Sequence, residues 1–250
     1  MELLIFDISG EFAHFRKFNT TSSPLTYTIP SRTSLAGLLG AIAGIGREEY
    51  YEHFLKEKAF IAIQVLNRIK KQGYGFNLIN TKEGMYRIKT RTQVRFEFVV
   101  NPSYRIFFGH SDENLYSDLK KRIKGKDFFF QPYMGLSQLT ADVNYVDSIE
   151  SVSENSNGPV EIITAVNLNS CVGAKIEIDP DLKYSSSIMP MEISLDLTDP
   201  LNRKNTSSDL PKNRKTNEYA EVIYEVTGKP VKVFVNSYNK VPGYGNILFL

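Results

Sequence analysis

The residues with the clearest chemical potential are cations set among aromatic rings. From Arg68 to Arg95 the chain carries eight Lys or Arg residues against one acid, Glu83. These cations are Arg68, Lys70, Lys71, Lys82, Arg87, Lys89, Arg91 and Arg95. Tyr74, Phe76, Tyr86 and Phe96 are interleaved with them. Cations neutralise phosphates and aromatic rings stack on unpaired bases, so the pattern is typical of an RNA-binding flap. The same pattern is equally typical of a solvent-exposed edge hairpin whose lysines prevent aggregation.

A second basic stretch favours the RNA-binding interpretation. No acid occurs between Glu11 and Glu48, whereas Arg16, Lys17 and Arg32 all fall there. A helix is predicted over Leu35–Ile45, with N-cap hydroxyls ahead of it between Ser31 and Ser34. Its first backbone N–H groups could bind a phosphate together with the hydroxyls of Ser31, Thr33 and Ser34. A sharp bend over Thr26–Pro30 could present Tyr27 to a base.

His14 is the strongest catalytic candidate. It stands beside Arg16 and Lys17, with Tyr27 close in sequence, and such a set could cleave RNA without a metal. The alternative, which we favour, is that His14 packs or hydrogen-bonds beside Phe12 and Phe15. The three histidines are scattered and Cys171 has no neighbouring cysteine, so neither a metal site nor a cofactor is expected.

Composition limits the class of protein. The 250 residues carry a formal net charge of only +2. Evidence for nucleic-acid binding must therefore come from local clusters of cations. A single cysteine excludes an internal disulfide and fits a cytoplasmic location. The first residues lack the basic region of a signal peptide, and the longest apolar run, Leu35–Ile45, is too short to span a bilayer. No membrane association is expected.

Periodicity predicts an α+β fold. Strands are expected at 3–8, 59–66, 91–100, 104–108 and 141–148, and helices at 35–45 and 111–123. The order, β-α-β-flap-β-α-β, is that of ferredoxin-like and RRM-like sheets. We therefore predict a ferredoxin-like domain over residues 1–150 with a projecting hairpin at about 68–90. A β-rich region over 151–250 would follow, with a linker near Ser151–Pro159 and a polar loop over Pro200–Lys215.

Several segments resemble one known family. They are Phe15-Arg16, Thr26-Tyr27, Pro30, Thr33 and the helix Leu35–Ile42, then Arg91–Phe98 with Asn101–Ile106, and Pro132–Ser137 with Ala141. Together these resemble the CRISPR-associated protein family 5 of the RAMP superfamily of RNA-binding proteins. The resemblance covers about the first 150 residues and is most similar to subtype I-B.

This resemblance implies a function. Such proteins are subunits of a type I interference complex (Cascade) that hold the 5′ handle of the CRISPR RNA and cap one end of the assembly. Family 7 backbone subunits, the family 8 large subunit and, in the assembled complex, target DNA would be the partners. On this view Arg68–Lys89 is a thumb hairpin and the subunit is not catalytic.

The residues that we predict to bind RNA are Arg16, Lys17, Tyr27, Arg32, Thr33, Ser34, Arg68, Lys70, Lys71, Arg87, Lys89, Arg91, Arg95 and Gly135. One alternative is a metal-independent endoribonuclease that processes precursor CRISPR RNA, as a branch of the family does with a His/Lys/Tyr set. Here only His14 near Tyr27 approaches that set. A generic single-strand binder is a third possibility.

Overall fold

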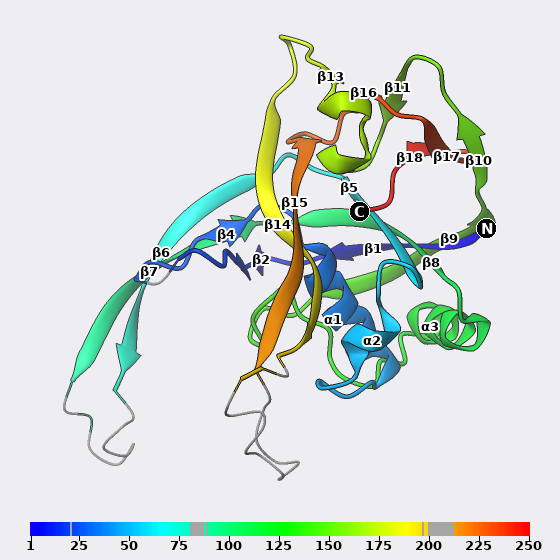
Figure 1. Cartoon of the computed structure of the whole chain (residues 1–250). Coiled ribbons are helices and arrows are strands. Elements are labelled where there is room, and N and C mark those ends of the chain that lie inside the picture. The colour runs from blue at the N-terminus through cyan, green and yellow to red at the C-terminus, as the bar shows by residue number, and fades with distance from the viewer. Residues whose placement is uncertain (21, 81–87, 89, 197, 200–212) are drawn as a thin grey trace.

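The fold is mostly β with few helices, and two long hairpins extend from its body (Figure 1). The computed structural model describes residues 1–20, 22–80, 88, 90–196, 198–199 and 213–250. No helix in this part of the chain is both long and apolar enough to cross a membrane.

A four-stranded antiparallel sheet forms the centre. Its strands are β1 (Glu2–Ser9), β5 (Ala59–Val65), β8 (Ser103–His110) and β9 (Asp142–Glu150), in the order β5-β8-β1-β9. Helix α1 (Arg32–Ala43) lies between β1 and β5 in the chain, and α3 (Glu113–Gly125) lies between β8 and β9. The β-α-β-β-α-β order of these elements is the order predicted from the sequence.

Both faces of this sheet are buried. Alternation along β1 sends Leu4, Phe6 and Ile8 into the core that includes the two helices. Leu3 and Ile5 point the other way, into a separate cluster completed by residues of the C-terminal strands. That cluster also contains Ala62, Phe107, Val241 and Ile247. The chain thus covers the sheet face that such folds can leave open to a ligand.

Helix α1 is defined by its caps. The Ser31 hydroxyl accepts a hydrogen bond from the backbone N–H of Ser34 at the N-terminal end. Gly44 closes the other end with φ of 77°, where a Cβ would fall 2.5 Å from the Phe129 ring. Leu35, Leu39 and Ile42 form its buried stripe. A short helix, α2 (Tyr50–His53), follows.

The first long hairpin is formed by β6 (Lys70–Ile79) and β7 (Arg91–Val100), with β2 (Phe12–Ala13) paired beside β7. The sequence placed the hairpin at about 68–90 and treated 91–100 as a half-buried strand of the main sheet. That part of the prediction is wrong, because 91–100 is the second strand of the hairpin. Its apolar alternation reflects rings that pack across the hairpin.

The second long hairpin lies in the C-terminal part and is formed by β14 (Tyr184–Leu195) and β15 (Arg214–Glu225). Met189, Met191, Ala220 and Val222 project from it into the main core. Residues 200–212, most of the predicted polar loop, lie outside the described residues.

The remaining strands are short. They are β3 (Phe15–Arg16), β4 (Thr26–Tyr27), β10 (Val152–Asn155), β11 (Pro159–Ile162), β12 (Val166–Asn167), β13 (Ile176–Glu177), β16 (Val231–Phe234), β17 (Ser237–Val241) and β18 (Gly245–Ile247). The predicted linker over 151–159 contains β10, which pairs with β17. The division into two domains near this point stays a prediction.

Candidate nucleic-acid interface

Strand register decides which cations of the first hairpin act together. Lys71 is paired with Val99, Gly75 with Arg95, and Ile79 with Arg91. Directly paired residues share a side of the sheet and alternate along each strand. Lys71, Arg91 and Arg95 therefore project from one side, together with Gly73, Gly75 and Glu97. We call this side the basic face.

The basic face contains a shallow cavity of about 280 Å³. Its lining residues are Ser23, Leu25, Lys71, Gln72, Gly73, Arg95, Phe96 and Glu97. Gly73 forms a low floor, since a Cβ there would lie 3.6 Å from the Arg95 Nε. The Lys71 ammonium is 2.9 Å from the Glu97 carboxylate, which also accepts a hydrogen bond from the backbone N–H of Thr26. The single acid of the cavity lining thus partly neutralises its two cations, Lys71 and Arg95.

The opposite side of the hairpin is aromatic. Phe76 packs 5.4 Å from Phe96 and 5.7 Å from Phe98 between ring centroids, and Phe12 lies 5.5 Å from Tyr74. This aromatic face borders a second cavity of about 250 Å³, lined by Phe12, Tyr74, Phe76, Phe98, Gln138 and Leu139. The sequence suggested rings interleaved with cations. The alternation of strands instead separates them, and it places Lys70, paired with Val100, on the aromatic side.

Two of the cations that we predicted to bind RNA, Arg16 and Lys17, lie between the hairpins. Arg16, in β3, is exposed, and its guanidinium donates to the carbonyl oxygen of Thr20 at 3.0 Å. The Lys17 ammonium is 5.7 Å from the centre of the Tyr27 ring. Strand β4, paired with β3, lies between the two long hairpins (Figure 1). Arg68 is exposed two residues before β6.

Tyr27 is not available to a base. Its side chain is 3% exposed, and its hydroxyl donates to the carbonyl oxygen of Ile188 at 2.8 Å. Burial raises the pKa of Tyr27 to about 12. The prediction that this ring stacks on RNA is wrong, because the ring belongs to the contact between β4 and β14.

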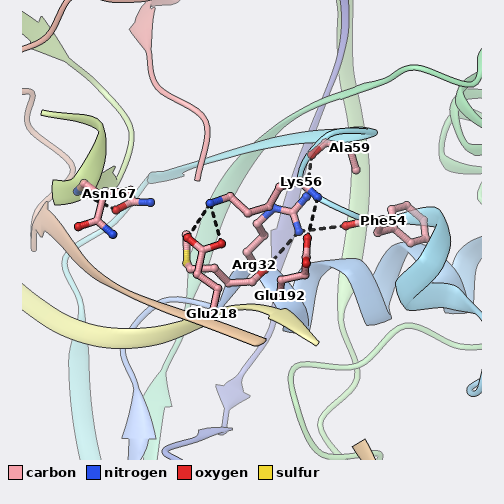
Figure 2. Close-up of polar contacts among 9 residues, drawn as sticks. Arg32, Phe54, Lys56, Ala59, Asn167, Glu192 and Glu218 are labelled. Carbon is pink, nitrogen blue, oxygen red and sulfur yellow. Dashed lines mark hydrogen bonds and ion pairs between the residues drawn. The ribbon is translucent and has the colours of Figure 1, made fainter. Parts of the chain in front are cut away.

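Arg32 is also withdrawn from the surface. The residue is 1% exposed, and its guanidinium donates to the carbonyl oxygens of Phe54, Ala59 and Met191 at 3.0, 2.8 and 3.2 Å. Figure 2 shows these bonds converging on one side chain. Burial lowers its pKa to about 10, although Glu192 and Glu218 favour the charged form. The prediction that Arg32 binds a phosphate is wrong, because its guanidinium is buried and donates hydrogen bonds to backbone carbonyls instead.

The surroundings of Arg32 show what it joins. Lys56 places its ammonium 2.8 Å from the Glu218 carboxylate, and its backbone N–H donates to Glu192 at 3.2 Å (Figure 2). Glu192 and Glu218 belong to the second hairpin, whereas Lys56 precedes β5. Arg32 and Lys56 therefore attach the second hairpin to the start of α1 and the loop before the central sheet.

The hydroxyls at the start of α1 bond to each other. Ser31 Oγ lies 3.0 Å from Thr33 Oγ1 and 2.8 Å from Ser34 Oγ. Thr33 and Ser34 are half-buried. The helix start thus caps itself, which accounts for these hydroxyls without a phosphate.

His14 lies inside a ring cluster. It is buried, with Nδ1 2.7 Å from the carbonyl oxygen of Glu97, and it packs against Phe96 and Phe98. Because a carbonyl only accepts, Nδ1 carries the proton. Burial lowers the pKa of His14. The packing that we favoured from the sequence is present, although its ring partners are Phe96 and Phe98.

Gly135 has a backbone reason to be glycine. It is exposed, has φ of 94°, and a Cβ would lie 2.1 Å from the carbonyl oxygen of His14. The neighbouring Met134 carbonyl accepts from the His14 N–H at 2.9 Å. Arg87 and Lys89 lie outside the described residues. Among those described, no three His, Cys, Asp or Glu side chains gather closely enough to hold a metal ion.

Two exposed rings near β3 and β4 were not predicted from the sequence to belong to the site. Phe18, in the loop after β3, is 58% exposed, and Tyr219, on β15, is 41% exposed. Their ring centroids are 4.8 Å apart. The one sequence feature that could have marked Phe18 as a site residue is its place directly after Lys17 in the basic stretch. Nothing in the sequence pairs it with a residue 201 positions later.

Comparison with known families places the chain. Residues 3–177, well over half of the sequence, match the model of a family described as CRISPR-associated protein (Cas_Cas5). The chain belongs to this family. The match includes the β6–β7 hairpin and its basic face, so these are parts of a family-5 protein. A comparison with curated proteins finds no match.

Solved structures share the fold of this family-5 chain. A CRISPR protein from Archaeoglobus fulgidus is 13% identical over the whole of both chains, with a TM-score of 0.56. A chain of a structure described as a CRISPR RNA-guided surveillance complex is 12% identical, with 91% of each chain covered and a TM-score of 0.52. At this level of identity the likeness concerns the fold alone.

Proposed function

We propose that this family-5 protein is a non-catalytic subunit of a type I CRISPR interference complex, where it binds the 5′ handle of CRISPR RNA and caps one end. Family 7 backbone subunits, the family 8 large subunit and target DNA in the assembled complex are its expected partners. Membership of the family supports this role, as does a fold shared with a chain of an RNA-guided surveillance complex. The β5-β8-β1-β9 order supports a ferredoxin-like domain, and subtype I-B remains the proposed subtype.

One observation carries the proposal: three cations share the basic face of a projecting hairpin. Lys71, Arg91 and Arg95 are exposed there, and Lys71 and Arg95 border a cavity whose floor includes Gly73. A floor without a side chain lets a phosphodiester backbone approach closely, while flexible cations replace its counterions. The central sheet offers no comparable surface, because both of its faces are buried.

The state of His14 supports a subunit that does not cleave RNA. A general base must reach the proton that it removes, and the lone pair of His14, on Nε2, is buried among the rings while Nδ1 donates to a backbone carbonyl. To test this, we would incubate the purified full chain with repeat RNA in EDTA. Intact RNA is the expected result. A cut at one position that His14→Gln abolishes would establish the endoribonuclease alternative.

The binding role has its own test. In Arg91→Ala/Arg95→Ala the affinity for the 5′-handle RNA should fall, and the dependence of log Kd on log salt should flatten by about two units. Lys70→Ala is the control and should flatten the slope by no more than about one unit, since it removes one cation from the aromatic side of the same hairpin. Equal effects in the two variants, or unchanged binding in both, would contradict a role for the basic face.

The complex-forming role is tested by co-expression with family 7 and family 8 subunits. Co-purification with both subunits and the RNA is expected. A protein that binds scrambled RNA equally well and assembles with neither subunit would be a generic single-strand binder.

A further inference from the structure

Phe18 and Tyr219 form an exposed aromatic platform at the junction of the two hairpins. The rings are tilted by 47°, and more than half of Phe18 is open to solvent. Tyr219 points outward because its neighbour Ala220 points into the main core. On the same outward side of the second hairpin Ile188 is exposed as well. Such a cluster of exposed apolar groups is typical of a binding site.

The platform is joined to the basic face by one short loop. Phe18 follows Arg16 and Lys17, and the same loop returns as Ser23 and Leu25, which line the cavity of the basic face. The backbone of this loop is paired near both ends, since the Lys17 N–H donates to the Leu25 carbonyl at 2.9 Å. Cations thus lie beside the rings and across the loop from them.

We propose that Phe18 and Tyr219 are a stacking site for one unpaired base of the bound RNA. The inference rests on the proposed function, because the base belongs to a strand whose phosphates lie on the basic face. The cations beside Phe18 favour this occupant over an apolar side chain of a protein, while Glu221 is the acid on the same outward side of β15 as Tyr219. The ring pair is next to Arg16 and Lys17, in a stretch of sequence with no acid from residue 12 to residue 47. Stacking needs no particular base, so the site adds affinity without sequence preference.

The chain offers a matched control pair elsewhere on its surface. Phe129 and Phe130 are 60% and 53% exposed, and their rings are also 4.8 Å apart. They lie at the end of α1, where their backbone N–H groups donate to the carbonyls of Ile42 and Ala41. Both pairs are exposed neighbouring rings, although Phe129 and Phe130 are tilted by 70° and lack a hydroxyl, and their position relative to the basic face differs.

The test compares two probes on the full-length chain. One is a labelled single-stranded oligouridylate of ~12 nucleotides, and the other is the same strand with abasic sites, which keeps the phosphates. The wild-type protein should bind the intact strand roughly 10- to 100-fold more tightly than the abasic strand. In Phe18→Ala/Tyr219→Ala this preference should largely disappear while the salt dependence stays unchanged. Phe129→Ala/Phe130→Ala should retain the preference.

Substitution by leucine separates stacking from general apolar contact. Phe18→Leu/Tyr219→Leu keeps apolar bulk without rings and should lose the preference as the alanine variant does. If the leucine variant retains it, or if the alanine pair leaves it intact, the stacking inference is wrong. The salt dependence of Arg91→Ala/Arg95→Ala then decides separately whether the proposed function stands. Thermal melting of each variant confirms that the compared chains are folded.

Discussion

The two long hairpins have similar secondary structure and opposite environments. In β14–β15, alternate side chains enter the main core, and Arg32 joins the hairpin to the body through the Met191 carbonyl. In β6–β7 most residues are exposed beyond the end that pairs with β2. Rings project from one side of this hairpin, and Lys71, Arg91 and Arg95 project from the other. A buried arginine can therefore hold one hairpin to the body through its hydrogen bonds, whereas exposed arginines on the other hairpin are available to bind a ligand. Burial makes the difference, and residue type alone does not reveal it.

The largest expected effect concerns the attachment of the second hairpin. Arg32→Ala removes the donor for three buried carbonyls and should lower the free energy of unfolding by about 3 kcal/mol or more. Chemical denaturation of the full chain measures this loss. Arg95→Ala is the control and should leave the free energy of unfolding almost unchanged. If Arg32→Ala keeps its stability and instead loses RNA binding, our assignment of Arg32 as structural is wrong.

A similar contrast applies to two glycines. Gly135→Ala places a Cβ against the His14 carbonyl at positive φ and should cost about 2 kcal/mol of unfolding free energy. Gly73→Ala meets only ordinary contacts with the Arg95 side chain and should fold normally. Because it raises the floor of the basic face, it should still weaken RNA binding. Equal stability of the two variants would contradict the close approach seen at Gly135.

A smaller change should strengthen the first hairpin as a binding element. Glu97→Gln removes the acid paired with Lys71 and should tighten RNA binding several-fold at low salt, with a steeper salt dependence. The amide oxygen can still accept from the Thr26 N–H, so the fold should be retained. Titrations at several salt concentrations measure both quantities. Weaker binding by this variant would mean that Glu97 orders the cavity more than it neutralises it.

The limits of prediction from sequence follow from the same contrast. Periodicity located β1, α1, β5 and α3, because each buries a regular apolar pattern against one core. It misplaced Arg91–Val100, since rings packed across a free hairpin produce the same alternation as rings packed on a sheet. The charges of Arg16, Arg32 and Arg95 were evident, but only Arg32 is buried, and its burial depends in part on β14, where the Met191 carbonyl accepts its hydrogen bond from 159 residues away.

The smallest effect concerns the ring cluster at the base of the first hairpin. Burial lowers the pKa of His14, so the folded chain favours the neutral ring. The unfolded chain then takes up a proton first as the pH falls below about 6.5, and the unfolding free energy should decrease by at most ~0.8 kcal/mol at pH 6. His14→Phe has no titrating ring at this position, so it should lose less stability between pH 7 and pH 6, as denaturation at each pH would measure. Parallel curves for the two proteins would show that His14 becomes protonated as readily inside the fold as outside it. The ring could then gain a proton where it lies, and an acid–base role for His14 would again be open.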